Sequence, residues 1–424
     1  MRLWRKMGAV MTGLRKTLRR KPMLDRREMM KRVGAGLAAL GAAGLDPVTA
    51  FALDTVTLPF DNGERPLVKY PQKRPMIGLT SRPPQLETPF SIFNDGAITP
   101  NNAFFVRYHL ADVPFNIDPD TFTLEIKGSV ERPLKLSLKE IRKLPAVELV
   151  AVNQCSGNSR GFFSPRVAGG QLGNGAMGNA RWRGVALKTL LGRAGVKAGA
   201  RQVTFNGMDG PVSDRTPDFV KALDIDHASD GEVMLAYGMN GEDLPLLNGF
   251  PLRLIVPGYY GTYWVKHLNE ITVIDDVFDG FWMKSAYRIP DNDCNCVEPG
   301  TAPKATIPIN RFTVRSFITS VTDGAKLKAG RVTLKGIAFD GGKGIKEVAV
   351  STDGGNSWTP AKLGKDLGKY SFREWKLPVK LAAGPHALKV RATSNGGQVQ
   401  PTESLWNPAG YLRNGIETTR VTAA

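Results

Sequence analysis

A change in the hydrophobic pattern near Lys304 is the feature that most constrains the fold of this chain. Beyond it, short runs of alternating apolar and polar residues are separated by turns such as Asp353-Gly354-Gly355, and the runs show no helical period. These runs are 331–339, 346–350, 371–375 and 386–392. Alternation with a period of two is typical of strands that bury one face. Residues 304–424 are therefore predicted to form a small antiparallel β-sandwich.

The chain before this point mixes helix and strand signals. Residues 137–140 (Ser-Leu-Lys-Glu) form a capping box that predicts a short helix, and residues 147–152 are typical of a buried strand. The Thr-Pro pair at 216–217 is predicted to open another helix. Residues 53–100 are rich in proline and polar residues and are expected to form an irregular arm. A mixed α+β domain is therefore predicted over residues 53–303.

The positive charge of the chain is concentrated at its beginning. The net charge is +18, which would favour nucleic acid or an anionic membrane as a partner, but half of the surplus lies in residues 1–52. An Ala/Gly/Leu stretch at 33–45 and the small-x-small sequence at 50–52 follow the basic run, in the order of an export signal. Paired Arg26 and Arg27 resemble a twin-arginine signal, with an ordinary secretory signal or an uncleaved anchor as alternatives. We predict export, no nucleic-acid partner and no stable membrane span.

The supply of metal-ligating residues is small. Three cysteines and four histidines are scattered, and Cys294-x-Cys296 with Cys155 does not have the spacing of a zinc site. A bound metal must therefore bring most of its own ligands. Cys155 ends a predicted strand and opens a Gly/Ser-rich loop, with Arg160 five residues further on. That setting suits a nucleophile or a soft metal ligand, and a structural cysteine is the alternative.

Basic residues also recur in segments that carry glycine or proline. Arg107, Arg253 and Lys266 are examples. Cations with fixed donors beside loops suit an oxyanion or a phosphate-bearing cofactor, and a solvated surface position is the alternative for each residue taken alone. No GxGxxG sequence or P-loop accompanies these basic segments, so they lack the common nucleotide fingerprints.

Several motifs together resemble the sulfite oxidase family of molybdopterin enzymes, in its bacterial sulfite dehydrogenase branch. In the first part of the chain they are VNQCSGNSRGFF around Cys155, FFVRYH around Arg107, NGFPLRLIVPG around Arg253, WVKHL around Lys266 and WMKSAYR around Tyr287. In the second part they are STDGGNSW and WNPAGYLRN. The resemblance implies a sulfite-oxidase-type molybdopterin domain at 53–303 and an immunoglobulin-like β-sandwich dimerisation domain at 304–424.

The resemblance also implies a set of site residues. Cys155 would be the protein's sulfur ligand to molybdenum. The residues expected to bind the molybdenum-molybdopterin cofactor are Phe105, Arg107, His109, Cys155, Asp209, Asn248, Arg253, Trp264 and Lys266. The residues expected to bind and orient the substrate are Arg107, Arg160, Tyr287 and Arg413, with Arg391 or Arg420 as alternatives to Arg413. Asn248 stands where many relatives have a histidine.

The implied activity is the oxidation of sulfite to sulfate by oxygen-atom transfer in the periplasm. No CxxCH sequence or cytochrome b5-like segment occurs in the chain, so electrons are expected to pass to a separate c-type cytochrome. The protein would be a homodimer or a complex with a cytochrome subunit. Alternatives within the superfamily are a sulfane dehydrogenase subunit of a thiosulfate-oxidising complex and a methionine sulfoxide reductase. A non-enzymatic exported binding protein is the alternative from another class, and no function follows for Cys294 and Cys296.

Overall fold

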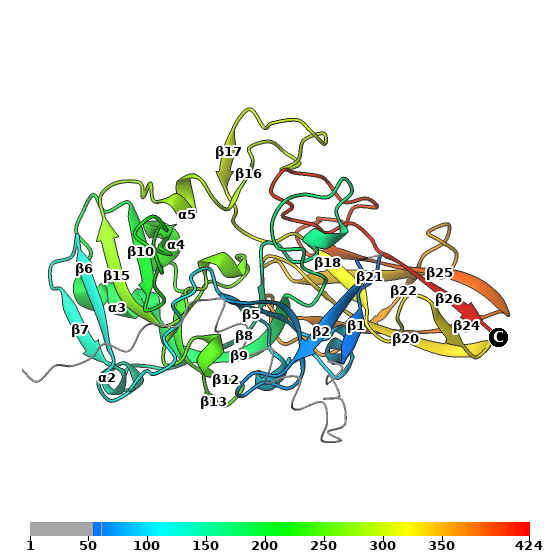
Figure 1. Cartoon of the computed structure of the whole chain (residues 1–424), viewed down its shortest axis with the longest axis horizontal. Helices are drawn as coiled ribbons and strands as arrows, with labels where there is room; N and C mark the ends of the chain where they lie inside the picture. The colour runs from blue at the N-terminus through cyan, green and yellow to red at the C-terminus, as the bar shows by residue number, and fades with distance from the viewer. Residues whose placement is uncertain (1–53, 61) are drawn as a thin grey trace, which may run out of the picture. The chain divides into compact units, whose positions relative to one another are not determined.

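The computed structural model describes residues 54–60 and 62–424 (Figure 1). The predicted export signal at 1–52 lies outside the described residues. Within the described part of the chain, no helix combines the length and the apolar character that crossing a membrane requires.

The segment expected to form an irregular arm instead forms strands. Four of them join a strand near Arg107 in a five-stranded sheet of order β1-β2-β3-β4-β5. The strands are β1 (Thr55–Thr57), β2 (Glu64–Val68), β3 (Met76–Ser81), β4 (Pro84–Glu87) and β5 (Val106–Arg107). Met76 and Leu86 are buried against Val106 and Tyr108. The prediction was wrong because such short strands, some of which contain proline, depend on tertiary pairing more than on local propensity.

The α+β part of the chain is built on two further sheets. One has the order β11-β10-β15-β6-β7, and the other has the order β13-β12-β9-β8 with β14 paired to β12. The first contains β6 (Thr123–Gly128), β7 (Leu134–Ser137), β10 (Gln202–Gly207), β11 (Lys221–Asp224) and β15 (Leu268–Ile274). The second contains β8 (Val147–Gln154), β9 (Met177–Ala186), β12 (Met234–Met239), β13 (Glu242–Asp243) and β14 (Arg253–Ile255). Strand β8 confirms the buried strand predicted at 147–152.

Short helices cover and connect these sheets. They are α2 (Leu138–Arg142), α3 (Leu187–Ala194), α4 (Ile225–Ser229), α5 (Phe281–Lys284), η1 (Phe90–Asn94), η2 (Asn101–Ala103), η3 (Arg160–Phe162), η4 (Leu246–Asn248) and η5 (Gly261–Tyr263). The predicted capping box of α2 is confirmed, because the Glu140 N–H donates to Ser137 Oγ over 3.3 Å and the Ser137 N–H donates to Glu140 Oε2 over 2.8 Å.

The helix predicted to open at 216–217 was wrong. Residues 216–220 form neither helix nor strand and lead directly into β11. The Phe219 ring stacks on the His109 ring, with centroids 3.7 Å apart, and meets Trp282 edge-on at 5.1 Å. The apolar side chain that suggested a helical face is thus buried by partners distant in sequence, a case of tertiary packing overriding a local pattern.

The final part of the chain confirms the predicted sandwich. Its sheets have the orders β18-β20-β24-β23 and β19-β26-β25-β21-β22, and a small hairpin of β16 and β17 precedes them. The strands are β16 (Arg288–Pro290), β17 (Thr306–Pro308), β18 (Arg315–Ile318), β19 (Ala325–Leu327), β20 (Gly330–Phe339), β21 (Ile345–Ser351), β22 (Thr359–Pro360), β23 (Lys362–Leu363), β24 (Arg373–Leu381), β25 (Gly384–Ser394) and β26 (Thr418–Ala423). Leu334 and Trp375 from one sheet pack in one core with Val348, Leu388 and Val421 from the other.

Candidate active site

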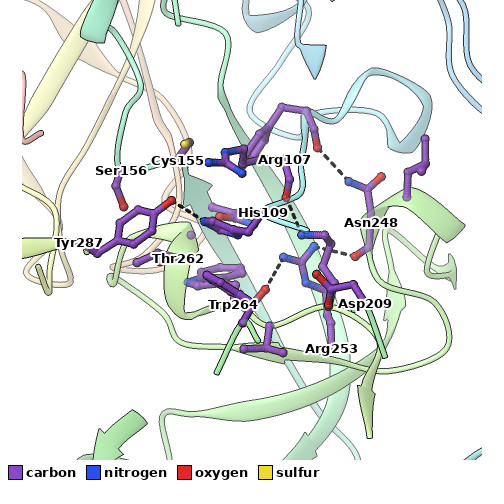
Figure 2. Close-up of a pocket in the computed structure, with 17 residues that line it drawn as sticks. Arg107, His109, Cys155, Ser156, Asp209, Asn248, Arg253, Thr262, Trp264 and Tyr287 are labelled. Carbon is purple, nitrogen blue, oxygen red and sulfur yellow. Dashed lines mark hydrogen bonds between the residues drawn. The ribbon is translucent and has the colours of Figure 1, made fainter. Parts of the chain in front are cut away.

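Most of the predicted site residues line one cavity (Figure 2). The space between its walls, including its opening to solvent, is about 560 Å³. The lining residues are Phe105, Arg107, His109, Asn153, Cys155, Ser156, Asp209, Phe219, Leu247, Asn248, Arg253, Gly261, Thr262, Trp264, Val265, Lys266 and Tyr287.

Cys155 lies at the cavity wall directly after strand β8. Its backbone N–H donates to the Ala176 carbonyl over 2.9 Å, which continues the pairing of β8 with β9 beyond the strand end. The residue is buried and its thiol is free. In Figure 2 the sulfur lies near the Arg107 side chain. The end of the strand therefore presents one thiol to the cavity, and the cation near it is Arg107, not the Arg160 that the sequence places five residues further on.

Three cations line the cavity, and none of them forms an ion pair among the described residues. Lys266 donates to the Arg107 carbonyl over 2.6 Å, and Arg253 donates to the Asn248 carbonyl over 2.7 Å. Burial lowers the pKa of Lys266 to about 7 and that of Arg253 to about 9. An anion bound here would favour the charged forms of both side chains, so the cavity is suited to a phosphate or an oxyanion.

Asp209 is the carboxylate among the lining residues. Burial raises its pKa, and the charge of Lys266 opposes this shift. One acid against three cations leaves the cavity with a surplus of positive charge.

His109 and Tyr287 form a hydrogen-bonded pair across the cavity, between imidazole Nε2 and the phenol oxygen. Burial, followed by the charge of Arg107, holds the pKa of His109 well below its ordinary value, and burial raises the pKa of Tyr287. Both groups are therefore neutral at neutral pH. With the proton on Nε2, His109 donates to the Tyr287 oxygen and leaves the hydroxyl proton for another acceptor.

Asn248 reaches the cavity from η4, but the protein engages both ends of its amide. Its Nδ2 donates to the Phe105 carbonyl over 3.0 Å, and its Oδ1 accepts from Lys73 Nζ over 2.6 Å. Lys73 also donates to the carbonyls of Asn101 and Phe104, over 2.7 and 2.9 Å. Asn248 thus fastens the segment around Phe105. Lys73 was not predicted as a site residue, because no local pattern distinguishes a lysine that becomes buried on folding.

Lys221 is a second buried lysine that sequence reasoning missed. Its Nζ donates to the Trp282 carbonyl over 2.6 Å and lies 5.3 Å from the centre of the Tyr287 ring. Burial lowers its pKa to about 7. Lys221 directly follows the segment that was wrongly predicted as a helix. Because of that wrong prediction, its proximity to Tyr287 was not expected.

Arg160, which was predicted to bind the substrate, is not among the lining residues. Its Nε donates to the Ala409 carbonyl over 3.0 Å, and its guanidinium lies 5.0 Å from the centre of the Tyr411 ring. Tyr411 in turn stacks on Tyr287, with ring centroids 5.6 Å apart. Arg160 is thus connected to the cavity through two stacked tyrosines.

The structure brings none of the three C-terminal arginine candidates to the cavity lining. Arg413 pairs with Glu417 over 2.5 Å. Arg391 lies 4.6 Å from the centre of the Trp358 ring, and Arg420 faces Asp323 at 3.9 Å. A direct role of Arg413 in substrate binding stays a prediction.

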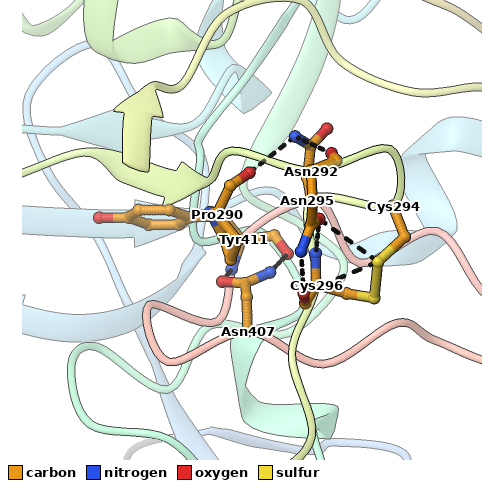
Figure 3. Close-up of a disulfide and its surroundings, with 7 residues drawn as sticks. All are labelled: Pro290, Asn292, Cys294, Asn295, Cys296, Asn407 and Tyr411. Carbon is orange, nitrogen blue, oxygen red and sulfur yellow. Dashed lines mark hydrogen bonds between the residues drawn. A yellow bond between two sulfur atoms is a disulfide. The ribbon is translucent and has the colours of Figure 1, made fainter. Parts of the chain in front are cut away.

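Cys294 and Cys296, for which the sequence suggested no role, form a disulfide in the loop after β16 (Figure 3). Val297, the next residue, donates its N–H to the Trp406 carbonyl over 2.9 Å. Further along that segment Tyr411 donates its N–H to Asn407 Oδ1 over 3.1 Å. The disulfide therefore closes a loop that adjoins the segment carrying Tyr411.

Buried polar atoms without partners show that the cavity suits a polar ligand. Among the described residues, Asn153 Oδ1, Ser156 Oγ, Arg253 Nε and Thr262 Oγ1 are buried without a hydrogen-bond partner, and all four residues line the cavity. Buried polar atoms are rarely left unsatisfied unless a ligand or water meets them. These atoms, the thiol and the surplus of cations fit a large anionic cofactor with a thiol-ligated metal.

Comparisons with known proteins agree with this geometry. Residues 109–282 match the oxidoreductase molybdopterin binding domain, and residues 306–422 match the Mo-co oxidoreductase dimerisation domain. Mitochondrial sulfite oxidase of Homo sapiens is 34% identical over 370 residues, which are 82% of this chain and 66% of that protein. Sulfite oxidase of Arabidopsis thaliana is 32% identical, over 81% of this chain and 93% of that protein.

The fold also has a solved counterpart. The sulfane dehydrogenase SoxCD from Paracoccus pantotrophus superposes with a TM-score of 0.69 at 24% identity, covering 89% of this chain and 90% of that chain. The fold and the cavity define a molybdopterin-binding oxidoreductase domain joined to a dimerisation domain. The chain belongs to the sulfite oxidase family and uses the molybdenum cofactor, although it spans only 66% of the length of the human enzyme.

Proposed function

We propose that the protein oxidises sulfite to sulfate by oxygen-atom transfer and passes the electrons to a separate c-type cytochrome. The observation that carries the proposal is the free Cys155 thiol, in a cavity that holds the neutral His109–Tyr287 pair and three cations that make no ion pair with any residue the structure describes. When bound, the molybdenum cofactor supplies the oxygen atom and accepts two electrons.

The residues of the cavity divide into two groups under this proposal. Cys155 would ligate the metal, because a thiolate is the soft ligand that the cavity offers. Arg253 and Lys266 would hold the anionic part of the cofactor, which would stabilise their charged forms. Trp264 would pack beside it, since its indole N–H is already occupied by the Tyr259 carbonyl over 3.0 Å.

Sulfite capture would depend on Arg107. Sulfite carries up to two negative charges near neutral pH, and charge-assisted hydrogen bonds to a guanidinium contribute about 1.5–3 kcal/mol each. Tyr287, held neutral by burial, would donate its hydroxyl proton to a substrate oxygen. Arg160, which lies against the Tyr411 ring, would add positive charge near the substrate.

Other parts of the proposal depend on the chain as a whole. We propose that residues 1–52 export the protein to the periplasm by a twin-arginine route, which is supported by Arg26 and Arg27 ahead of a weakly hydrophobic stretch. We also propose that it works as a homodimer or with a cytochrome subunit, which is supported by the match to a dimerisation domain.

The test is cytochrome c reduction by protein purified from a molybdenum-replete host. Sulfite should reduce the cytochrome, thiosulfate should not, and methionine sulfoxide should not be consumed. Molybdenum should be present at about one atom per chain, in line with one thiol ligand. Activity with a sulfane sulfur substrate instead would support the sulfane dehydrogenase alternative, and a loaded protein inert towards sulfite would refute the proposal.

A further inference from the structure

Glu87, at the end of β4, is a fully buried carboxylate that the proposed mechanism does not use. Among the residues that the structure describes, it makes no ion pair. It accepts two hydrogen bonds, from the backbone N–H of Gly173 over 3.0 Å and from that of Gly175 over 3.2 Å. Burying a carboxylate without an ion pair costs free energy, which these two hydrogen bonds partly offset.

The segment that Glu87 holds, residues 172–176, forms the back of the Cys155 loop. The N–H of Cys155 donates to the Ala176 carbonyl over 2.9 Å, and the N–H of Ser159 donates to the Gly173 carbonyl over 2.7 Å. Gly161, next to Arg160, donates to the Leu172 carbonyl over 3.0 Å. The positions of the thiol and of Arg160 therefore depend on where this segment lies.

The other side of β4 leads to Arg107. Strand β4 pairs with β5, with Leu86 opposite Val106 and Gln85 opposite Arg107. Strand β4 is therefore connected to Arg107 through its pairing with β5, and to the Cys155 loop through the Glu87 carboxylate.

The approach of the segment to β4 is close. A Cβ on Gly175 would lie 2.1 Å from the Thr88 carbonyl oxygen, so only glycine permits it. Thr88 also donates its N–H to the Gly175 carbonyl over 2.9 Å. The segment therefore contacts the end of β4 through the Glu87 carboxylate and through the backbone of Thr88, the residue that follows the strand.

We infer that Glu87 is a positioning residue, whose carboxylate sets the spacing between Arg107 on one side and Cys155 with Arg160 on the other. The inference rests on the proposed function for its effect on sulfite, but its effect on residues 172–176 is independent of that function. A carboxylate offers an acceptor to both glycine N–H groups. In the Glu87→Gln variant an amide NH₂ replaces one acceptor, so one of the two N–H groups loses its partner.

The ionisation of Glu87 sets the conditions of the test. Burial raises its pKa to about 7, opposed by the Gly173 and Gly175 N–H groups and by the charge of Arg65 on β2. The carboxyl is therefore ionised at pH 8.5 and protonated at pH 6. Assays at pH 8.5 compare the wild-type protein with Glu87→Gln. The matched control is Glu270→Gln, which removes an exposed carboxylate that pairs with Lys127 over 2.8 Å.

Two measurements test the inference. In Glu87→Gln we expect amide hydrogen exchange to quicken in residues 172–176, and the sulfite KM to rise about tenfold with a smaller change in kcat, because a lost buried hydrogen bond displaces the anion-binding groups. The control should change neither. Unchanged exchange in 172–176, a KM within about twofold of wild type, or a fall in kcat and molybdenum content at unchanged KM would each overturn the inference.

Two further measurements apply if the variant does not fold or if the protein does not oxidise sulfite. If Glu87→Gln does not fold, amide hydrogen exchange is measured in the wild-type protein at two pH values instead. After correction for intrinsic exchange rates, the protection of residues 172–176 should be lower at pH 6 than at pH 8.5. Equal protection at the two pH values would overturn the inference. If wild type does not oxidise sulfite, the proposed function fails, and the exchange data together with the dissociation constant for sulfate still decide the role of Glu87.

Discussion

Glu417→Gln is predicted to destabilise the protein through a buried charge cluster that connects the sandwich to the Cys155 loop. Glu417 Oε1 accepts from Arg413 over 2.5 Å and from Arg315 over 3.2 Å. Arg315 also donates to Ser159 Oγ over 2.7 Å. A glutamine at this position leaves both guanidinium groups without a carboxylate partner. The other Glu417 oxygen accepts from Asn174 Nδ2 over 2.9 Å, so the amide of the variant has this contact to satisfy as well.

The size of the effect follows from burial. The side chains of Arg315, Arg413 and Glu417 are 2%, 11% and 16% exposed. Removing one partner of a buried ion pair costs about 3–5 kcal/mol, and the partial exposure of Glu417 favours the lower end. At about 2.1 cal/mol/K per residue, unfolding about 370 residues carries an entropy of roughly 0.8 kcal/mol/K, so Tm should fall by about 4 °C.

Scanning calorimetry of purified variants measures this shift. The matched control is Glu125→Gln, because Glu125 pairs with Lys135 over 3.0 Å while the two side chains are 43% and 65% exposed. The control should leave Tm unchanged, since exposed ion pairs contribute little. Equal Tm values for Glu417→Gln and Glu125→Gln would refute the reasoning that burial makes the Glu417 cluster important.

Three further predictions concern the site and export. Cys155→Ser should abolish sulfite-dependent cytochrome c reduction while circular dichroism stays that of wild type, and retained activity would contradict the ligand role. Lys73→Met leaves Asn248 Oδ1 without its donor and should lower the molybdenum content per chain by elemental analysis; full occupancy would show that the contact is dispensable. Changing Arg26 and Arg27 together to Lys should leave folded protein in the cytoplasm, measured by immunoblots of cell fractions, and normal export would argue against the twin-arginine route.

Much of the fold could be predicted because its signals are local. The period-two runs after Lys304 became the sandwich, and the capping box at 137–140 became the start of α2. The strands of the N-terminal sheet were missed because each is only two to six residues long, and their pairing, not their composition, stabilises them. The helix expected at 216–217 failed because Phe219 packs on His109 instead of joining a helical face.

The site divides in a similar way. Motifs identified Cys155, Arg107, Arg253 and Lys266, and the structure brings all four to one cavity. Arg160 was also identified, but it is not among the lining residues and lies against the Tyr411 ring, a contact that no spacing in the sequence encodes.

The residues expected to carry the chemistry are recognisable in the amino-acid sequence: one thiol at the end of a strand, cations in loops that carry glycine or proline, and too few ligands for a metal without its own cofactor. The buried charges that support them are recognisable only in the folded chain. Lys73 and Glu87 are ordinary polar residues in the sequence, and both are buried beside segments more than eighty residues away. The cost of burying a charge depends on the groups that surround it after folding, and segments distant in sequence supply those groups.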